Sequence, residues 1–149
     1  MNVVLTPEQF NKDKIYFTDP IENTVMEDSK FIKILYSNEL ITLNGIFVDM
    51  KLKIFHKENY FKKIKYTFDT GINTEILHKI YNIESDILNH YNCNKQKKTI
   101  INDSLSSGMM KIFPNSDYNN YTSNIFILKI SGIWENANEY GVTYKIVIG

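Results

Sequence analysis

The sequence contains no arginine, and all 17 of its basic residues are lysine. A guanidinium group binds a phosphate or the edge of guanine through two parallel hydrogen bonds, which the ammonium group of lysine cannot make. Any contact with nucleic acid must therefore combine point charges with base stacking. This composition disfavours sequence-specific recognition of a duplex.

Cysteine occurs once, at Cys93, so no internal disulfide can form. This usage is typical of a reducing compartment. No apolar run reaches the roughly 20 residues of a membrane-spanning helix, and the N-terminus lacks the charged and then apolar order of a secretion signal. We expect an intracellular protein of the cytoplasm or nucleus that does not associate with a membrane.

Motifs of catalysis and metal binding are also missing. His90 and Cys93 are one helical turn apart and could supply two zinc ligands, but neither His56 nor His78 provides a second pair with ligand spacing. The serines at 104–108 lack the glycine pattern of a nucleophile elbow. We therefore expect no catalytic site, no metal and no cofactor.

With 149 residues, the chain has the length of one ordinary domain. Residues 1–29 contain Pro7 and Pro20 and are predicted to be an irregular, acidic lead-in. Residues 30–149 are predicted to form the folded domain.

Three strands are predicted in the first half of that domain, at residues 30–37, 41–55 and 60–68, from alternation and from β-branched and aromatic residues. Side chains alternate across a strand, so apolar residues should face the core and lysines the solvent. The predicted core positions are Val48, Met50, Leu52, Ile54, Ile64, Tyr66 and Phe68.

A helix is predicted at residues 74–91, because Ile76, Ile80, Ile83 and Ile87 recur at helical spacing. Strands are predicted after it at 109–113, 125–134 and 142–148. This order matches a mainly β protein, an oligonucleotide-binding-type Greek-key barrel of five or six strands, with one amphipathic helix between the third and fourth strands.

Charge is balanced overall, with 17 acidic residues against the 17 lysines, but residues 50–66 carry six lysines and one acid, Glu58. Aromatic residues are interleaved with these lysines. The predicted nucleic-acid-binding face consists of Phe47, Lys51, Lys53 and Phe55 on one strand and Phe61, Lys63 and Lys65 on the next. Lysines would follow phosphates and aromatic rings would stack on bases. A lysine-rich, solvated sheet face is the alternative.

Three further candidates lie on the last two predicted strands: Lys129, Trp134 and Lys145. A tryptophan at a strand end is commonly a core or rim anchor, and a stacking role is the alternative for Trp134.

Two segments, LYSNELITLNGIFVDMKLK at 35–53 and NIFILKISGIWENANEYGVTYKIV at 124–147, resemble single-stranded DNA-binding proteins of giant nucleocytoplasmic DNA viruses, which are similar to the phage T7 type. The resemblance implies an oligonucleotide-binding barrel that coats displaced strands during viral DNA replication or repair. Single-stranded DNA, replication proteins and further copies of the chain would be its partners. A β-rich virion or assembly protein that acts through protein contacts is the alternative function.

Overall fold

The computed structural model describes residues 3–23, 27–38, 40–113 and 125–148. In this part the protein is mainly β, as predicted, with short 3-10 helices at Pro7–Gln9 and Lys12–Lys14. The other elements are β1 (Ile15–Phe17), β2 (Ile21–Glu22), β3 (Lys30–Ser37), β4 (Thr42–Leu43), β5 (Ile46–Lys51), β6 (Ile54–Tyr60), β7 (Lys63–Phe68), α1 (Thr74–Tyr91), β8 (Gln96–Lys98), α2 (Ile100–Leu105), β9 (Met109–Ile112), β10 (Ile125–Glu135) and β11 (Glu139–Ile148).

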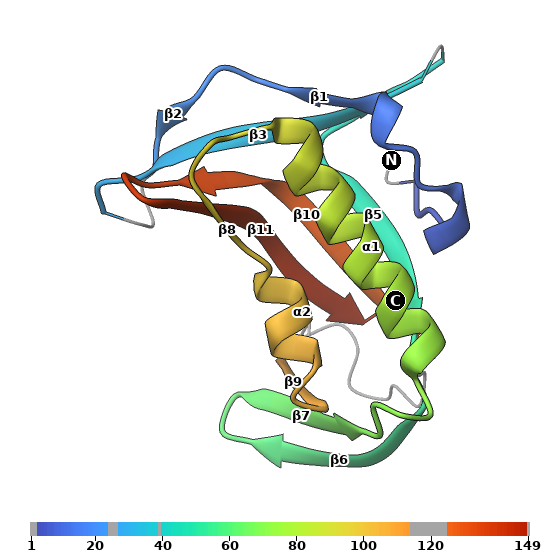
Figure 1. Cartoon of the computed structure of the whole chain (residues 1–149). Helices are drawn as coiled ribbons and strands as arrows, with labels where there is room; N and C mark the ends of the chain where they lie inside the picture. The colour runs from blue at the N-terminus through green and yellow to red at the C-terminus, as the bar shows by residue number, and fades with distance from the viewer. Residues whose placement is uncertain (1–2, 24–26, 39, 114–124, 149) are drawn as a thin grey trace.

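Strand β10 organises the larger sheet and has neighbours along both of its edges (Figure 1). Along one edge it forms a long antiparallel hairpin with β11, and along the other it pairs first with β5 and then with β3. The change of partner coincides with a bulge between Ile130 and Gly132. A Cβ added to Gly132 would lie 2.5 Å from the carbonyl oxygen of Ile32, so only glycine fits there.

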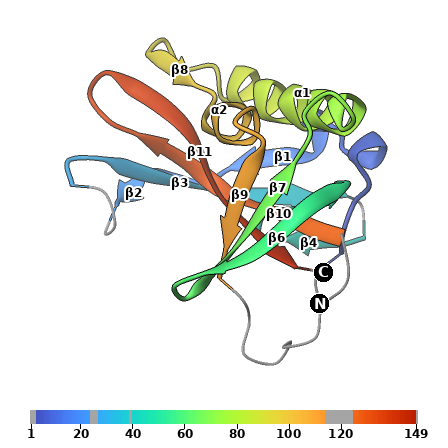
Figure 2. The same ribbon diagram turned by 90° about the horizontal axis from the view of Figure 1, so that it is seen from below.

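Strands β6, β7 and β9 form a separate three-stranded antiparallel sheet, which Figure 2 shows in front of the β10–β11 hairpin. The chain enters this small sheet at a corner formed by Leu52 and Lys53. Asn73, which is buried, fixes the corner: its Oδ1 accepts from the Lys53 N–H at 2.8 Å, and its Nδ2 donates to the Lys53 carbonyl at 3.1 Å. A side chain just before α1 therefore sets the angle between the two sheets.

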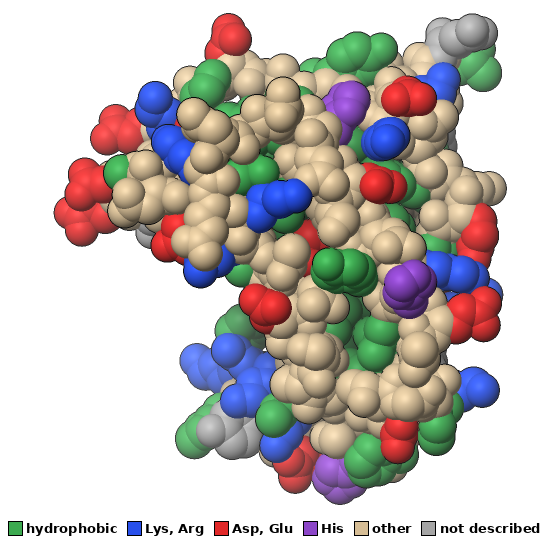
Figure 3. Space-filling view, viewed as in Figure 1, with side chains coloured by type: hydrophobic (Ala, Val, Ile, Leu, Met, Phe, Trp, Pro, Cys, Tyr) green, Lys and Arg blue, Asp and Glu red, His purple; other side chains and the backbone are tan. Residues whose placement is uncertain are grey.

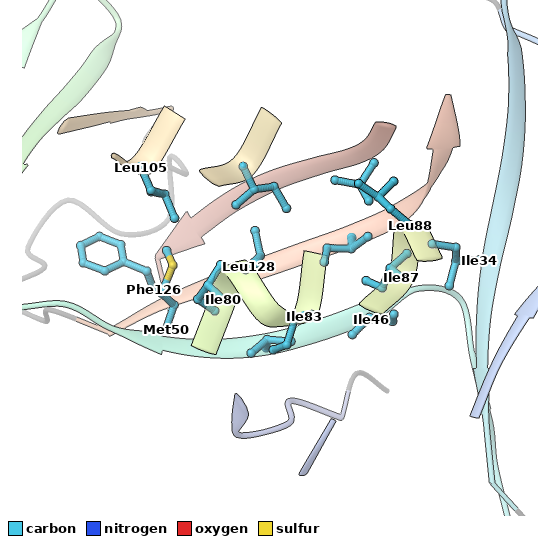
Figure 4. Close-up of a cluster of buried hydrophobic side chains, with 14 of the residues drawn as sticks. Ile34, Ile46, Met50, Ile80, Ile83, Ile87, Leu88, Leu105, Phe126 and Leu128 are labelled. Atoms are coloured by element: carbon cyan, nitrogen blue, oxygen red, sulfur yellow. The ribbon is translucent and has the colours of Figure 1, made fainter. Parts of the chain in front are cut away.

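Helix α1 packs its apolar stripe on the large sheet, as its periodicity predicts. Ile80, Ile83 and Ile87 are at most 3% exposed, and Ile76 is partly buried. Figure 4 shows the buried isoleucines beside side chains from β5 and β10, namely Ile46, Met50, Phe126 and Leu128. Lengthwise burial of this stripe is what holds the helix on the sheet.

The inward positions predicted for the first strands are confirmed, and they join the two sheets in one core. Val48, Met50, Leu52, Tyr66 and Phe68 are at most 2% exposed, while Ile54 and Ile64 are partly buried. The Tyr66 ring meets the Phe126 ring edge-on, with centroids 5.0 Å apart. No helix among the described residues is both long and apolar enough to cross a bilayer.

Helix α2 is held by a buried carboxylate that the sequence did not single out. Glu84 on α1 accepts hydrogen bonds from the backbone N–H groups of Ile101 (2.9 Å) and Asn102 (3.0 Å), the first turn of α2. These N–H groups have no partner within their own helix, so the carboxylate acts as their cap. Burial raises the pKa of Glu84 above its ordinary value, although the two hydrogen bonds oppose that shift.

Several predictions of element order are wrong. Residues 1–29 are not an irregular lead-in throughout, because β1 and β2 pair with β3, and Leu5 bridges to Val48. The predicted strand at 41–55 is broken at the Leu52–Lys53 corner, and its last residues begin β6.

The helix also has a different place in the order. It follows the seventh strand rather than the third, since short strands that lack a clear alternation precede it. Neither α2 nor β8 was predicted. Short elements of this kind owe their pairing to tertiary contacts rather than to their own pattern.

Substituting Glu84 with glutamine should change how stability depends on pH. The folded pKa lies above the ordinary value of 4.5, so the contribution of Glu84 is full below that pH and is lost as the pH rises through the folded pKa. Glutamine does not titrate. In urea unfolding, the free energy of unfolding of the wild type minus that of Glu84→Gln should therefore be largest near pH 4 and smaller at neutral pH. A difference that grows with pH would show that the two hydrogen bonds outweigh burial.

Candidate functional site

The outer face of the small sheet carries lysine and aromatic side chains in register. Lys65 on β7 lies between Glu58 on β6 and Lys111 on β9. Two residues before it on the same strand face, Lys63 places its Nζ 4.7 Å from the ring centroid of Phe113. Phe113 directly follows β9 and is 68% exposed. One sheet face thus combines three lysines with an exposed aromatic ring.

A row of lysines continues from this face onto the large sheet. On the small sheet Lys65 is opposite Lys111, and on the large sheet Lys145 of β11 is opposite Lys129 of β10. Lys111 and Lys145 line the same groove, so the row passes over the boundary between the sheets. At its far end Lys129 holds its Nζ 5.5 Å from the ring centroid of Phe47 on β5. We call Lys65, Lys111, Lys145 and Lys129 the lysine row.

The groove in the middle of the row has a volume of about 330 Å³. It is lined by Ser104, Met110, Lys111, Ile112, Phe113, Tyr144, Lys145, Ile146 and Val147. Its described lining contains two lysines, two aromatic rings and no acidic residue. We call it the seam groove, because it lies where the two sheets meet.

The seam groove exists because two strand edges face each other without a ladder between them. Within the described residues, β9 pairs only with β7, and β11 pairs with β8 only over Glu139–Gly141. The remainder of β11 borders the groove through Tyr144 to Val147. Edge strands direct N–H and C=O groups outward, so the groove is bordered by backbone donors and acceptors as well as by side chains.

One described acid is paired across strands with the lysine row, and a second, Asp49, lies on the same sheet face two residues along β5 from Phe47. Figure 3, viewed from the α1 side, shows a group of basic side chains beside the small sheet, and acidic side chains both there and near β2 and the β10–β11 turn. The one described acid opposite the row is Glu58, which lies 3.6 Å from the Lys65 ammonium group and 3.6 Å from the His56 ring. At the paired positions of the row, four lysines therefore outnumber one described acid, which favours an anionic ligand.

The lysine face predicted from sequence is divided by the structure. Lys51 and Lys53 are exposed, but they line a different groove, beside Glu8, Asp49 and Glu75. Lys51 itself lies 3.9 Å from Asp49. The prediction that they share one face with Lys63 and Lys65 is wrong, because the chain changes sheet at residues 52–53.

The predicted aromatic residues are dispersed in the same way. Phe55 sits at a bulge between Ile54 and His56 and is 70% exposed. Phe61 is in the β6–β7 turn, at φ 56°, and is 92% exposed. Neither faces outward from a regular strand as predicted, although both remain on the small sheet.

Trp134 is a packed residue on the large sheet. It is half-buried, and a Cβ added to Gly141 on the neighbouring strand would lie 2.8 Å from its ring. Of the three candidates on the last strands, only Lys129 and Lys145 belong to the lysine row.

Three residues of the site were missed from sequence: Lys111, Phe113 and Tyr144. Lys111 and Phe113 alternate with buried Met110 and Ile112, so the strand pattern would have placed both on the outer face. Tyr144 precedes Lys145 on β11. No local sequence pattern predicts that this part of β11 borders a groove.

The described residues contain no group of three or more His, Cys, Asp or Glu side chains that could hold a metal. Cys93 donates from its Sγ to Glu135 at 3.1 Å, and the Tyr91 hydroxyl lies 3.4 Å from the same oxygen. Burial raises the pKa of the Cys93 thiol and raises that of Tyr91 to about 12. The thiol therefore stays protonated, which disfavours a role as nucleophile.

No protein-family model, no curated protein and no solved structure matches this chain. Inference about function therefore depends on the geometry of the molecule and on general physical chemistry. The lysine row and the seam groove are the features that support it.

Proposed function

We propose that the protein binds single-stranded DNA without sequence preference, along the lysine row and over the seam groove. The observation that supports the proposal is the lysine row itself, to which four strands of two sheets each contribute one ammonium group. Ammonium groups in a line are suited to a phosphate backbone. Exposed aromatic rings beside them, such as Phe113 and Phe61, offer stacking surfaces for bases.

A single strand suits this surface better than a duplex. Stacking on an aromatic side chain requires a base face that is not already stacked in a helix, which a single strand supplies. The absence of arginine removes the side chain that most often reads guanine in the major groove. Lysine and aromatic contacts distinguish bases weakly, so binding should tolerate any sequence.

The proposal also includes a more specific fold than a mainly β protein. We propose that the curled large sheet, the small sheet and α1 form an opened oligonucleotide-binding-type barrel, with the seam groove at the opening. The proposal includes a role in coating displaced strands during intracellular viral replication or repair, which is the role that the sequence patterns at 35–53 and 124–147 suggested. Replication proteins and further copies of the chain would then be its partners.

A β-rich structural or assembly protein is the second candidate. It is favoured by apolar side chains exposed on β1, on β2 and in the β3–β4 turn, where Tyr16 is 57%, Ile21 61% and Leu40 91% exposed. Scattered apolar side chains are common on protein surfaces, whereas four aligned lysines with one described acid opposite them form a distinct positive field. DNA binding is therefore the proposal to test first.

Replacing Lys65, Lys111, Lys129 and Lys145 together with alanine should weaken binding and flatten its salt dependence. Removing one phosphate contact with a single strand lowers the slope of log K against log salt by about 0.7, so four contacts correspond to about 2.8. Fluorescence anisotropy of a labelled dT oligonucleotide over a range of NaCl concentrations measures both quantities.

The matched control replaces Lys79, Lys95, Lys97 and Lys98, which changes net charge equally. These lysines lie outside the lysine row, where they contact Glu8 and Glu75, Glu135, Asn89 and Glu139. The control should keep the wild-type slope. Equal slopes for both variants would remove the lysine row from the proposal, and no binding by the wild type at low salt would favour the structural alternative.

Replacing Glu58 with glutamine should strengthen binding. The substitution removes the described acid that faces the row and releases Lys65 from its 3.6 Å ion pair. Exposed ion pairs contribute about 0.2–1 kcal/mol, so the affinity at low salt should rise by about 1.4- to 5-fold. Glu139→Gln, which removes an acid paired with Lys98, is the control and should leave affinity unchanged. An unchanged affinity for Glu58→Gln would mean that DNA does not approach Lys65.

A further inference from the structure

Two other depressions of the described surface differ chemically from the seam groove. One, of about 450 Å³, lies between α1, α2 and the β7–α1 loop and has no Lys, Asp or Glu in its lining. The other, of about 320 Å³, contains Lys51, Lys53 and Lys79 together with three carboxylates. Among these three, the seam groove alone combines lysines with aromatic and aliphatic walls in a lining that includes no acid.

The walls of the seam groove are apolar and its two borders are cationic. Met110, Ile112 and Ile146 line it along with the rings of Phe113 and Tyr144. Lys111 stands on the β9 border and Lys145 on the β11 border, and both are exposed. A ligand that fits must be flat and apolar on its faces and must carry negative charge on both sides.

A nucleotide within a strand meets this description. Its base has apolar faces and a polar edge, and phosphates flank it in both directions along the backbone. The groove volume of about 330 Å³ is within the range of roughly 300–1,000 Å³ usual for small-ligand sites. The facing edges of β9 and β11 supply backbone N–H and C=O groups that can meet the polar edge of a base.

We propose that the seam groove takes one base of the bound strand out of the stack, with its two flanking phosphates on Lys111 and Lys145. This inference rests on the proposed single-strand binding and deepens it, because it assigns the groove an occupant and predicts a fixed register between strand and protein. The base enters between β9 and β11, while the neighbouring phosphates follow the lysine row in both directions.

Photo-crosslinking of the full chain tests where the base lies. A dT oligonucleotide with 5-iododeoxyuridine in place of one thymidine is bound, irradiated and digested, and the crosslinked residue is identified by mass spectrometry. The adduct is expected on Phe113 or Tyr144. Adducts on Phe61 or Phe55 alone would overturn the groove as the site of the base, even if salt-sensitive binding persisted.

A filling variant tests the groove without touching any lysine or core residue. Ser104 is exposed on α2 and lines the groove, so Ser104→Trp should occupy it. Losing one stacked base should weaken binding by about 5- to 150-fold while leaving the salt slope unchanged. Ser106→Trp is the matched control, because Ser106 lies two residues away and lines the depression beside α1 instead. It should bind like the wild type.

The outcomes separate this inference from the proposed function. If Ser104→Trp binds like the wild type while the substitutions in the lysine row flatten the salt slope, the groove assignment is wrong and single-strand binding stands. Absence of wild-type binding overturns both. If thymidine monophosphate alone displaces the crosslink at concentrations comparable with those of the oligonucleotide, the groove is a site for free nucleotides, and its proposed occupation by a strand is overturned.

Discussion

The corner at Leu52 and Lys53 determines the rest of the structure. Both backbone hydrogen-bonding groups of Lys53 are bound by the amide of Asn73, which is 3% exposed. A buried amide with these partners is costly to displace, because its removal would leave backbone groups unpaired. The corner turns β6 out of the large sheet, so that β6, β7 and β9 form their own sheet. The open edge between β9 and β11, and hence the seam groove, follows from this separation.

The elements predicted correctly are those whose own residues contain the signal. β3 and α1 have the predicted bounds, because alternation and helical spacing persist over their full lengths. The strand predicted at 41–55 failed because alternation continues across the corner, while the hydrogen bonds that break it come from Asn73, twenty residues further along. Phe61 was placed in a strand because a bulky aromatic residue at positive φ is rare and has no sequence signature.

Part of the site was predictable, but its arrangement was not. Lys63, Lys65, Lys129 and Lys145 were identified as exposed lysines on strands, yet the row that joins three of them depends on the register between strands far apart in sequence. That register also brings four lysines together on a protein of zero net charge. Balanced composition therefore does not exclude phosphate binding.

Hydrogen exchange with and without a dT oligonucleotide can show whether a strand lies over the open edges of β9 and β11, on which the proposed binding mode depends. We expect amides of 109–113 and 142–148 to exchange more slowly with the oligonucleotide bound, because these edges lack a neighbouring strand in the described structure. Amides of β1 and β2, at the far end, should be unaffected. Protection confined to β1 and β2 or to α1, with β9 and β11 unchanged, would rule out binding over these edges.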